Sequence, residues 1–501
     1  MALEERRRHV DRLCGFGVKS QWWQILSCSS WHRIANQGHK IMSGFRRLFR
    51  TSLKSSLLGS VFMVAGVISA HATSLEDAVR ISLATNPDIG IVASNREAVD
   101  QELRQARGLY LPQIDGAAGI GRENHSDPTR RQQNKDDDWL TREEASVTLI
   151  QRLFTGFETE QTVARDKARV ESAANRVFEN AEFLALDTVG SYHEVLRLRE
   201  LVNLSDKNVR IHIGIVDSIG EQLAGGGGSR ADLAQSESRL SRARSTLART
   251  FNDLRDDEAF YTRVVGQFPD DLSMPEFDLA LMPTNLNEAI GWVNDDNPTV
   301  EIFEADVRSA EAEVGISESP FYPQVNFEAQ SAYTDNADGL SDYEINNQLM
   351  VRLRWNIFRG GIDKAARQEA LARMNEAKNR RHASLVEAQR EMRNSWFALE
   401  GNRQQVEDLT DAVEFSRETR DAYREQFDVA QRTLLDVLDA ENELFVSKGQ
   451  LVTSQINEIL ASYRILALGG QLLLSLGVPA PEQAVVVEKS WAEEIGLSLE
   501  D

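Results

Sequence analysis

Four charged side chains near residue 440 recur at helical spacing and are the strongest candidate for a functional group. Arg432, Asp436, Asp439 and Glu443 follow one another at spacings of four, three and four. On a helix these spacings place all four on one stripe. A stripe rich in carboxylates can attract cations or pair with a cationic side chain on a neighbouring helix. The alternative is that these are ordinary solvated acids on an exposed helix face.

A fainter copy of this segment lies 204 residues earlier in the chain. At that offset Asp232 corresponds to Asp436, and Gly228 takes the place of Arg432. The earlier copy contains four consecutive glycines, Gly225–Gly228, which we expect to form a looser turn. Because long helical runs flank both copies, the chain contains two versions of one helix-hairpin tip.

The remaining residues show no pattern that predicts catalysis or cofactor binding. There is no glycine-rich phosphate loop, no nucleophile elbow and no paired-acid cleft. The histidines that follow residue 72 lack metal-ligand spacing; they are His125, His193, His212 and His382. We therefore expect no enzyme activity, no cofactor and no metal site.

The start of the chain predicts export. From Met42 several basic residues precede the apolar run LLGSVFMVAGVISA, and a small-x-small site follows it. This order is typical of a secretory signal peptide. We assign residues 42–72 to a signal peptide cleaved after Ala72, and residues 1–41 to a non-native N-terminal extension from an upstream start codon. A membrane anchor is the alternative, but the apolar run is too short to cross a bilayer.

Composition excludes several classes of protein. Residues 1–72 hold 11 Lys/Arg and 3 Asp/Glu of the chain's 56 and 78, so the remainder has 45 against 75, a net charge of -30. Such an acidic chain is a poor partner for nucleic acid and suits a periplasmic or cation-conducting protein. The mean hydropathy of -0.39 excludes a bundle of membrane-spanning helices. Both cysteines, Cys14 and Cys28, precede Met42, so no disulfide is expected in the exported chain.

The chain is an internal duplication. Short motifs recur 211 residues apart near the ends of the two halves and 204 apart in the middle. The matched residues include Pro87 with Pro298, Pro112 with Pro323, Phe154 with Phe358, Tyr192 with Trp396, and Gly266 with Gly477. The offset between matched residues changes by seven, which fits a shorter hairpin and then a two-turn helix insertion in the second half. We expect a first repeat over 73–283, a second over 284–479, and an acidic C-terminal tail over 480–501.

Each repeat predicts the same order of elements. A short helix precedes Asn-Pro, and the proline begins a second helix. Two strands follow, and then two very long helices with a tip between them. The strands are expected at about 110–123 and 143–154 in the first repeat, and at about 323–334 and 343–357 in the second. The long helices are expected at about 158–223 and 229–266, and at about 362–427 and 432–476.

The strands and helices together predict an assembly of several copies. Alternation such as Val325 and Phe327 with Asn326 and Glu328 fits a membrane-barrel strand, and it equally fits a half-buried soluble sheet. The first helix of each hairpin runs more than 60 residues without proline, or roughly 100 Å, so it must pack along other long helices. Two strand pairs cannot close a barrel, and lipid tolerates no open sheet edge. If the strands cross a bilayer, several copies share one barrel.

With these features in place, the chain resembles the TolC family of outer-membrane efflux and type I secretion channels. The resemblance covers roughly 73–479 and lies in the paired Asn-Pro and Pro-Gln sites, the Phe-x-Gly strand exits and the segment RTLLDVLDAENEL. It implies a mainly helical fold with a transmembrane β part: a homotrimer whose chains share a 12-stranded outer-membrane barrel and a long periplasmic helical barrel. It also implies a periplasmic adaptor protein, an inner-membrane RND or ABC transporter and outer-membrane lipid as partners.

The resemblance assigns roles to residues at the two tips. Asp436 and Asp439 resemble an aspartate ring at the periplasmic entrance, and Arg432 resembles an arginine that links helices and holds the entrance shut. Asp232 resembles its acidic partner on the neighbouring helix pair. Phe427 stands where an aromatic hydroxyl makes a further link, which phenylalanine cannot supply. The adaptor would dock at Gly225, Gly226, Gly227, Gly228, Ala430 and Gln431.

Two other functions fit parts of the sequence. A general diffusion porin has many strands and few helices, so a far-UV spectrum dominated by helix would exclude it. A soluble periplasmic coiled-coil scaffold would appear in the soluble fraction when cells are fractionated, whereas a channel would stay with the outer membrane. The transported cargo, drugs or proteins, cannot be read from the residues.

Overall fold

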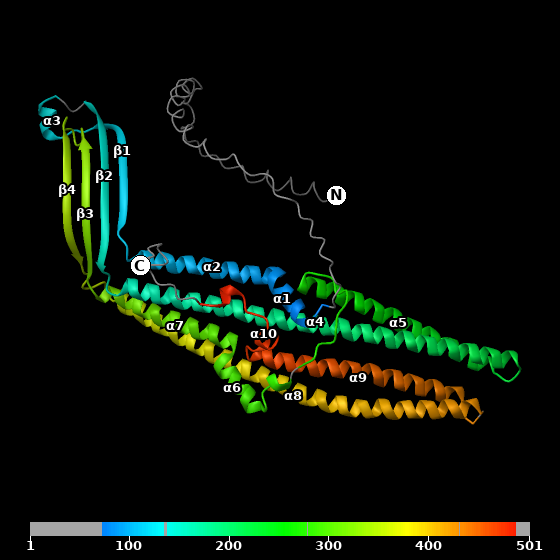
Figure 1. Cartoon of the computed structure of the whole chain (residues 1–501). Coiled ribbons are helices and arrows are strands. Elements are labelled where there is room, and N and C mark those ends of the chain that lie inside the picture. The colour runs from blue at the N-terminus through cyan, green and yellow to red at the C-terminus, as the bar shows by residue number, and fades with distance from the viewer. Residues whose placement is uncertain (1–72, 135–137, 278, 430, 487–501) are drawn as a thin grey trace, which may run out of the picture. The chain divides into compact units, whose positions relative to one another are not determined.

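A computed structural model describes residues 73–134, 138–277, 279–429 and 431–486 (Figure 1). The predicted extension (1–41), the signal peptide (42–72), Ala430 and all but the beginning of the C-terminal tail lie outside the described residues. Within the described ranges both halves of the chain carry the predicted order of elements.

The Asn-Pro pairs set the boundary between two helices in each half. Asn86 lies between helix α1 (Leu75–Thr85) and helix α2 (Pro87–Gly108) and caps both. The side chain of Asn86 accepts a hydrogen bond from the Asp88 N–H, which satisfies one of the unpaired donors at the start of α2. The second half repeats this arrangement with Asn297 between α6 (Leu286–Asp296) and α7 (Pro298–Glu318).

Four strands form one antiparallel sheet in the order β1-β2-β3-β4. They are β1 (Gln113–Asn124), β2 (Trp139–Phe154), β3 (Gln324–Asp335) and β4 (Tyr343–Arg354). The strand pairs of the two halves meet where β2 pairs with β3. The edges of the sheet, along β1 and β4, have no strand partner among the described residues.

The two faces of the sheet differ in polarity. The register places Leu149 opposite Ile114 and Ala329, and Ala329 opposite Leu349, so one apolar row crosses all four strands. In this row Ile114 and Leu349 are exposed, at 65% and 77%, and Leu149 and Ala329 are half-buried. The opposite face carries polar groups, among them the ion pair of Arg352 Nε with Glu328 Oε2 at 2.9 Å.

Two long helical hairpins extend from the sheet (Figure 1). In the first, α4 (Glu158–Ala224) is followed by α5 (Arg230–Val265); in the second, α8 (Ile362–Asp428) is followed by α9 (Leu434–Leu468). Both α4 and α8 have 67 residues, and the hairpins contact each other through α4 and α9. No helix in the described ranges is long and apolar enough to cross a membrane.

The main core lies partway along the hairpins, where the short helices pack on them. Tyr192 of α4 and Tyr261 of α5 are fully buried there. The Tyr192 hydroxyl accepts a hydrogen bond from the Ser273 N–H at 3.0 Å and lies 2.8 Å from the Thr73 carbonyl. This core holds the hairpins together near the short helices. The tips lie outside this core, so other contacts must stabilise them.

One predicted helix, 432–476, is wrong in its extent. The helix α9 ends at Leu468, and a separate short helix α10 (Leu472–Ser475) follows. Gly470 adopts a left-handed backbone (φ +66°), and a side chain on Gly469 would lie 2.8 Å from the Trp292 ring. The seven-residue change of offset here is therefore a Gly-Gly break with α10, and not a two-turn helix insertion.

The predicted strand 343–357 is also too long. The strand β4 ends at Arg354, whose partner is Gln324, the first residue of β3. Pro323 precedes Gln324 and has no N–H to donate, so residues beyond Arg354 find no partner. The polar segment between β1 and β2 contains a short helix α3 (Pro128–Gln132) capped by Asp127.

Candidate functional site

The charged stripe lies at the start of α9, at the tip of the second hairpin. Thr433 is the N-cap: its hydroxyl accepts from the Asp436 N–H at 3.3 Å and donates to Asp436 Oδ2 at 2.8 Å. The Thr433 N–H donates to the same carboxylate, which completes a capping box. These hydrogen bonds lower the pKa of Asp436, and its side chain stays 36% exposed. Asp436 is therefore both a structural cap and an exposed anion.

Arg432 is held within its own hairpin. Its guanidinium lies 4.2 Å from the centre of the Tyr423 ring, a cation–π contact. Its Nε donates to Gln426 Oε1 at 2.9 Å, and its Nη1 lies 3.9 Å from Asp436 Oδ2. The sequence analysis placed Arg432 near Asp436 but missed Tyr423 and Gln426, which come from the preceding helix.

Asp439 joins the two hairpins. Its Oδ1 accepts a hydrogen bond from Arg239 Nη2 at 2.7 Å, and Arg239 belongs to α5 of the first hairpin. The side chain of Asp439 remains 57% exposed, and that of Arg239 is 26% exposed. Sequence analysis missed this pair. The sequence did contain a signal for it: at the offset of 204, the first repeat has the cation Arg239 where the second repeat has the anion Glu443.

An apolar cluster supports the tips beneath these charges. Ile219 of α4 packs with Leu434 and Leu438 of α9, and Phe427 of α8 and Leu233 of α5 lie against them. All four long helices therefore contribute. Phe427, noted from the sequence for its missing hydroxyl, is a half-buried packing residue here.

The Arg432–Asp232 link is not formed within one chain. Arg432 has the partners given above, and Asp232 lies half-buried in the first turn of α5. Among the described side chains none forms an ion pair with Asp232.

The glycine tip is a turn with backbone hydrogen bonds to the end of α4. The Gly225 N–H donates to Glu221 O, and the Gly227 N–H donates to Gln222 O, both at 2.9 Å. Gly226 has a left-handed backbone (φ +83°), and a side chain on Gly228 would lie 2.8 Å from Leu223 N. At the second tip the Gln431 N–H donates to Gln426 O at 2.8 Å; Ala430 is outside the described residues.

A buried ionic group lies farther along α9 and was not predicted. Glu441 is 4% exposed and lies 3.2 Å from the Nη1 of Arg420 on α8. His212 of α4 is also buried, and burial lowers its pKa, opposed by the nearby Glu441 carboxylate. Since α4 and α9 belong to different hairpins, His212 and Glu441 lie where the two hairpins meet. Within the described ranges no group of metal-ligand side chains lies at the tips; one lies at the far end of the sheet.

Comparisons with known proteins show which family the chain belongs to. The family model described as "Outer membrane efflux protein" matches residues 78–267 and 293–471. The outer membrane efflux protein BepC of Brucella suis is 24% identical over 422 residues, which cover 83% of this chain and 90% of that protein. The outer membrane protein TolC of Salmonella enteritidis is 20% identical, over 82% of this chain and 86% of that protein.

Solved structures share the fold. The CmeC outer membrane channel of Campylobacter jejuni superposes with a TM-score of 0.70 at 16% identity, covering 79% of this chain and 86% of that one. The MtrE outer membrane channel of Neisseria gonorrhoeae gives 0.68 at 16% identity, covering 79% and 89%. Outer-membrane channels are not enzymes, and a porin's many strands differ from the four strands found here. The family match covers most of both repeats, and the chain belongs to the outer membrane efflux protein family.

Proposed function

We propose that three copies of this chain assemble into one continuous exit duct through the outer membrane. The observation that carries the proposal is the open, two-faced sheet. Its edges along β1 and β4 lack strand partners among the described residues, and its apolar face is exposed. In lipid, unpaired edges are too costly to persist. Pairing β4 of one copy with β1 of the next would close a barrel with the apolar face toward lipid and the polar face toward the lumen.

The helical hairpins would continue this barrel as a periplasmic tube. Helices as long as α4 and α8 need lateral partners on more than one side, and neighbouring copies would supply them. At the tips, Asp436 and Asp439 from each copy would form an acidic ring around the axis. The exposure of both carboxylates and their position on one stripe support this role.

Contacts between copies would keep this entrance closed. Arg432 is presented at the tip by Tyr423 and Gln426, and Asp232 has no ionic partner among the described side chains of its own chain. A neighbouring copy would bring the two together. Separation of the hairpins would then require loss of these contacts and of the Arg239–Asp439 pair.

Partners would supply the energy that the duct lacks. A periplasmic adaptor would dock at the tips near Gly225–Gly228 and Phe427–Gln431, and an inner-membrane RND or ABC transporter would drive the cargo. Relatives carry names such as pyoverdine export outer membrane protein and toluene efflux pump outer membrane protein, both from Pseudomonas. Small toxic compounds are therefore the first cargo to test, with secreted proteins as the second.

Conductance in planar bilayers tests the acidic ring. The wild-type channel should be blocked by divalent cations, and Asp436→Asn with Asp439→Asn should raise the half-blocking concentration roughly tenfold or more, since several like charges are removed from one constriction. The control is Asp411→Asn with Glu414→Gln, which removes two exposed carboxylates from α8 that lie more than three turns before the tip. Unchanged block in the double variant would refute the ring.

A further inference from the structure

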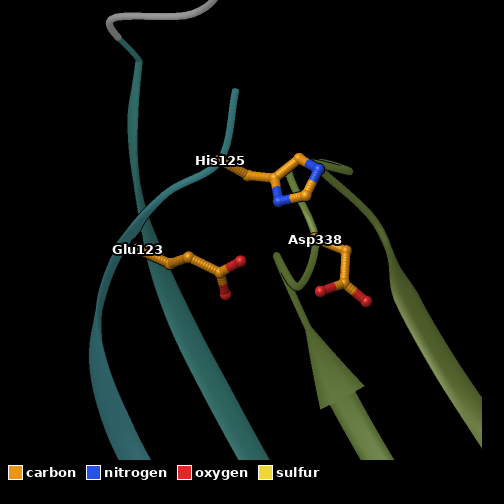
Figure 2. Close-up of side chains that lie close together, drawn as sticks. All are labelled: Glu123, His125 and Asp338. Carbon is orange, nitrogen blue, oxygen red and sulfur yellow. The ribbon is translucent and has the colours of Figure 1, made fainter. Parts of the chain in front are cut away.

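Three side chains with metal-binding groups converge at the end of the sheet that lies away from the hairpins. Glu123 is near the end of β1, His125 follows that strand, and Asp338 lies in the turn between β3 and β4 (Figure 2). One ligand atom from each lies within 4.8 Å of those of the other two. Glu123 and His125 are half-buried and Asp338 is exposed.

Contacts outside this group hold the two segments together. The Arg130 guanidinium of α3 donates a hydrogen bond to the Gly339 carbonyl, next to Asp338. Asn336 Nδ2 donates to the Thr141 carbonyl at 3.0 Å, which ties the same turn to β2. The β3–β4 turn is therefore already placed beside the end of β1 before any ion binds.

The side chains themselves are oriented as well. Glu123 Oε2 lies 2.8 Å from Arg142 Nη1, and the Asp338 N–H donates to the Glu123 carboxylate. His125 Nε2 lies 3.6 Å from Asp127 Oδ2. A carboxylate has about four lone-pair sites, so Glu123 can keep Arg142 and still bind a cation.

We propose that Glu123, His125 and Asp338 bind one divalent transition-metal ion of the Zn²⁺ class. One imidazole and two carboxylates form a donor set that suits Zn²⁺, Ni²⁺ or Cu²⁺, whereas Ca²⁺ and Mg²⁺ prefer oxygen ligands alone. Bonds of about 2.0–2.2 Å around Zn²⁺ require the three ligand atoms to move closer, which the exposed Asp338 and the half-buried Glu123 and His125 can do by rotation of their side chains. Three protein ligands leave a fourth position for water or for a group from another molecule.

The ion would join the segment after β1 to the β3–β4 turn, two parts of the chain from different repeats. In the proposed duct this end of the sheet faces the cell exterior, so the ion would link the loops around the exit. That placement rests on the proposed function, whereas metal binding does not. Failure of one can therefore be told from failure of the other.

Calorimetric titration of the purified full chain in detergent, without a histidine tag, tests the site with Zn²⁺ alone after chelator treatment. We expect one saturable site per chain and at least tenfold weaker binding in His125→Gln and in Asp338→Asn. His382→Gln, which removes an exposed histidine from α8, should bind as the wild type does. Each variant is first compared with the wild type by circular dichroism.

Three results would overturn the proposal. These are absence of saturable Zn²⁺ binding by the wild type, wild-type affinity in folded His125→Gln, and equally tight binding of Ca²⁺. Glu123→Gln also loses the ion pair with Arg142 and can lose its fold for that reason. The decisive variant is therefore His125→Gln, since the imidazole has only the longer contact with Asp127 to lose.

Discussion

Arg239 on α5 and Asp439 on α9 form a 2.7 Å ion pair that joins the two helical hairpins of one chain close to their tips. The pair partly neutralises one of the two aspartates proposed for the acidic ring. The ring charge therefore depends on a residue in the other repeat, and the strength of cation block becomes a measure of this contact.

Removal of the Arg239 cation should strengthen cation block of the duct. In Arg239→Gln, Asp439 keeps its charge and loses its partner, a change of about 1 kcal/mol in attraction for a cation at the tip. The half-blocking concentration of Mg²⁺ in planar bilayers should fall roughly fivefold. Arg242→Gln, which removes an exposed cation from the same helix, is the control. Equal block in both variants would contradict the role given to the pair.

Loss of the Glu441 charge should destabilise the chain far more than loss of the Glu443 charge two residues away. Glu441→Gln leaves Arg420 without its buried anion, and breaking such pairs costs about 3 kcal/mol. Glu443 is exposed, so Glu443→Gln should shift the melting temperature in detergent very little. The double variant Arg420→Met with Glu441→Leu should recover most of the loss. No recovery would show that Glu441 acts through something other than this pair.

Glu182 should make the stability of the main core depend on pH. Its carboxylate is 1% exposed and accepts hydrogen bonds from the Leu472 and Leu473 N–H groups of α10. Burial raises its pKa to about 7, and the two hydrogen bonds oppose that shift. The folded state thus holds the proton more tightly than the unfolded state. The stability it contributes is complete below pH 4.5 and is lost as pH rises through 7.

The comparison of wild type with Glu182→Gln isolates this effect, because glutamine does not titrate. Between pH 4.5 and pH 8 the free energy of unfolding of the wild type should fall by about 3 kcal/mol relative to that of the variant. The melting temperatures of the two proteins should therefore converge or cross as the pH rises. Glu200→Gln, an exposed position on the same helix, should run parallel to the wild type. Parallel curves for Glu182→Gln as well would rule out a titrating Glu182.

The break between α9 and α10 should depend on Gly470. In Gly470→Ala the new methyl group would lie 2.8 Å from Asp296 O, at a backbone φ of +66°, so we expect a loss of about 1–2 kcal/mol. Gly90→Ala is the matched control: Gly90 lies within α2 with nothing near its added methyl group, so that change should stabilise by about 0.5–1 kcal/mol. Thermal melts of both variants would separate the two effects, and equal shifts would contradict the strained turn.

Local sequence signals predicted most of the fold. Proline after Asn86 and Asn297 set helix starts, and two-residue alternation located the strands, because these signals act between neighbours in the chain. The predicted ends of the elements were wrong where a residue distant in the sequence determines where an element stops. The strand β4 ends where Pro323 begins its partner, and α9 ends where Trp292 and Asp296 lie against Gly469 and Gly470.

The site was predicted in part for the same reason. Spacing along one helix predicted that Asp436 and Asp439 lie on one stripe, whereas Arg432 precedes α9 and its N-cap Thr433. Spacing could not place Arg239 or Tyr423 beside them, because those residues come from other helices. The group of Glu123, His125 and Asp338 was missed entirely, since a search for ligand spacing cannot detect a partner in the other repeat.

The mass of the processed protein purified in detergent tests the central claim most directly. Light scattering with correction for bound detergent should give three copies per particle, because four strands with open edges need neighbours to close a barrel. A stable monomer that binds neither detergent nor lipid would contradict the account.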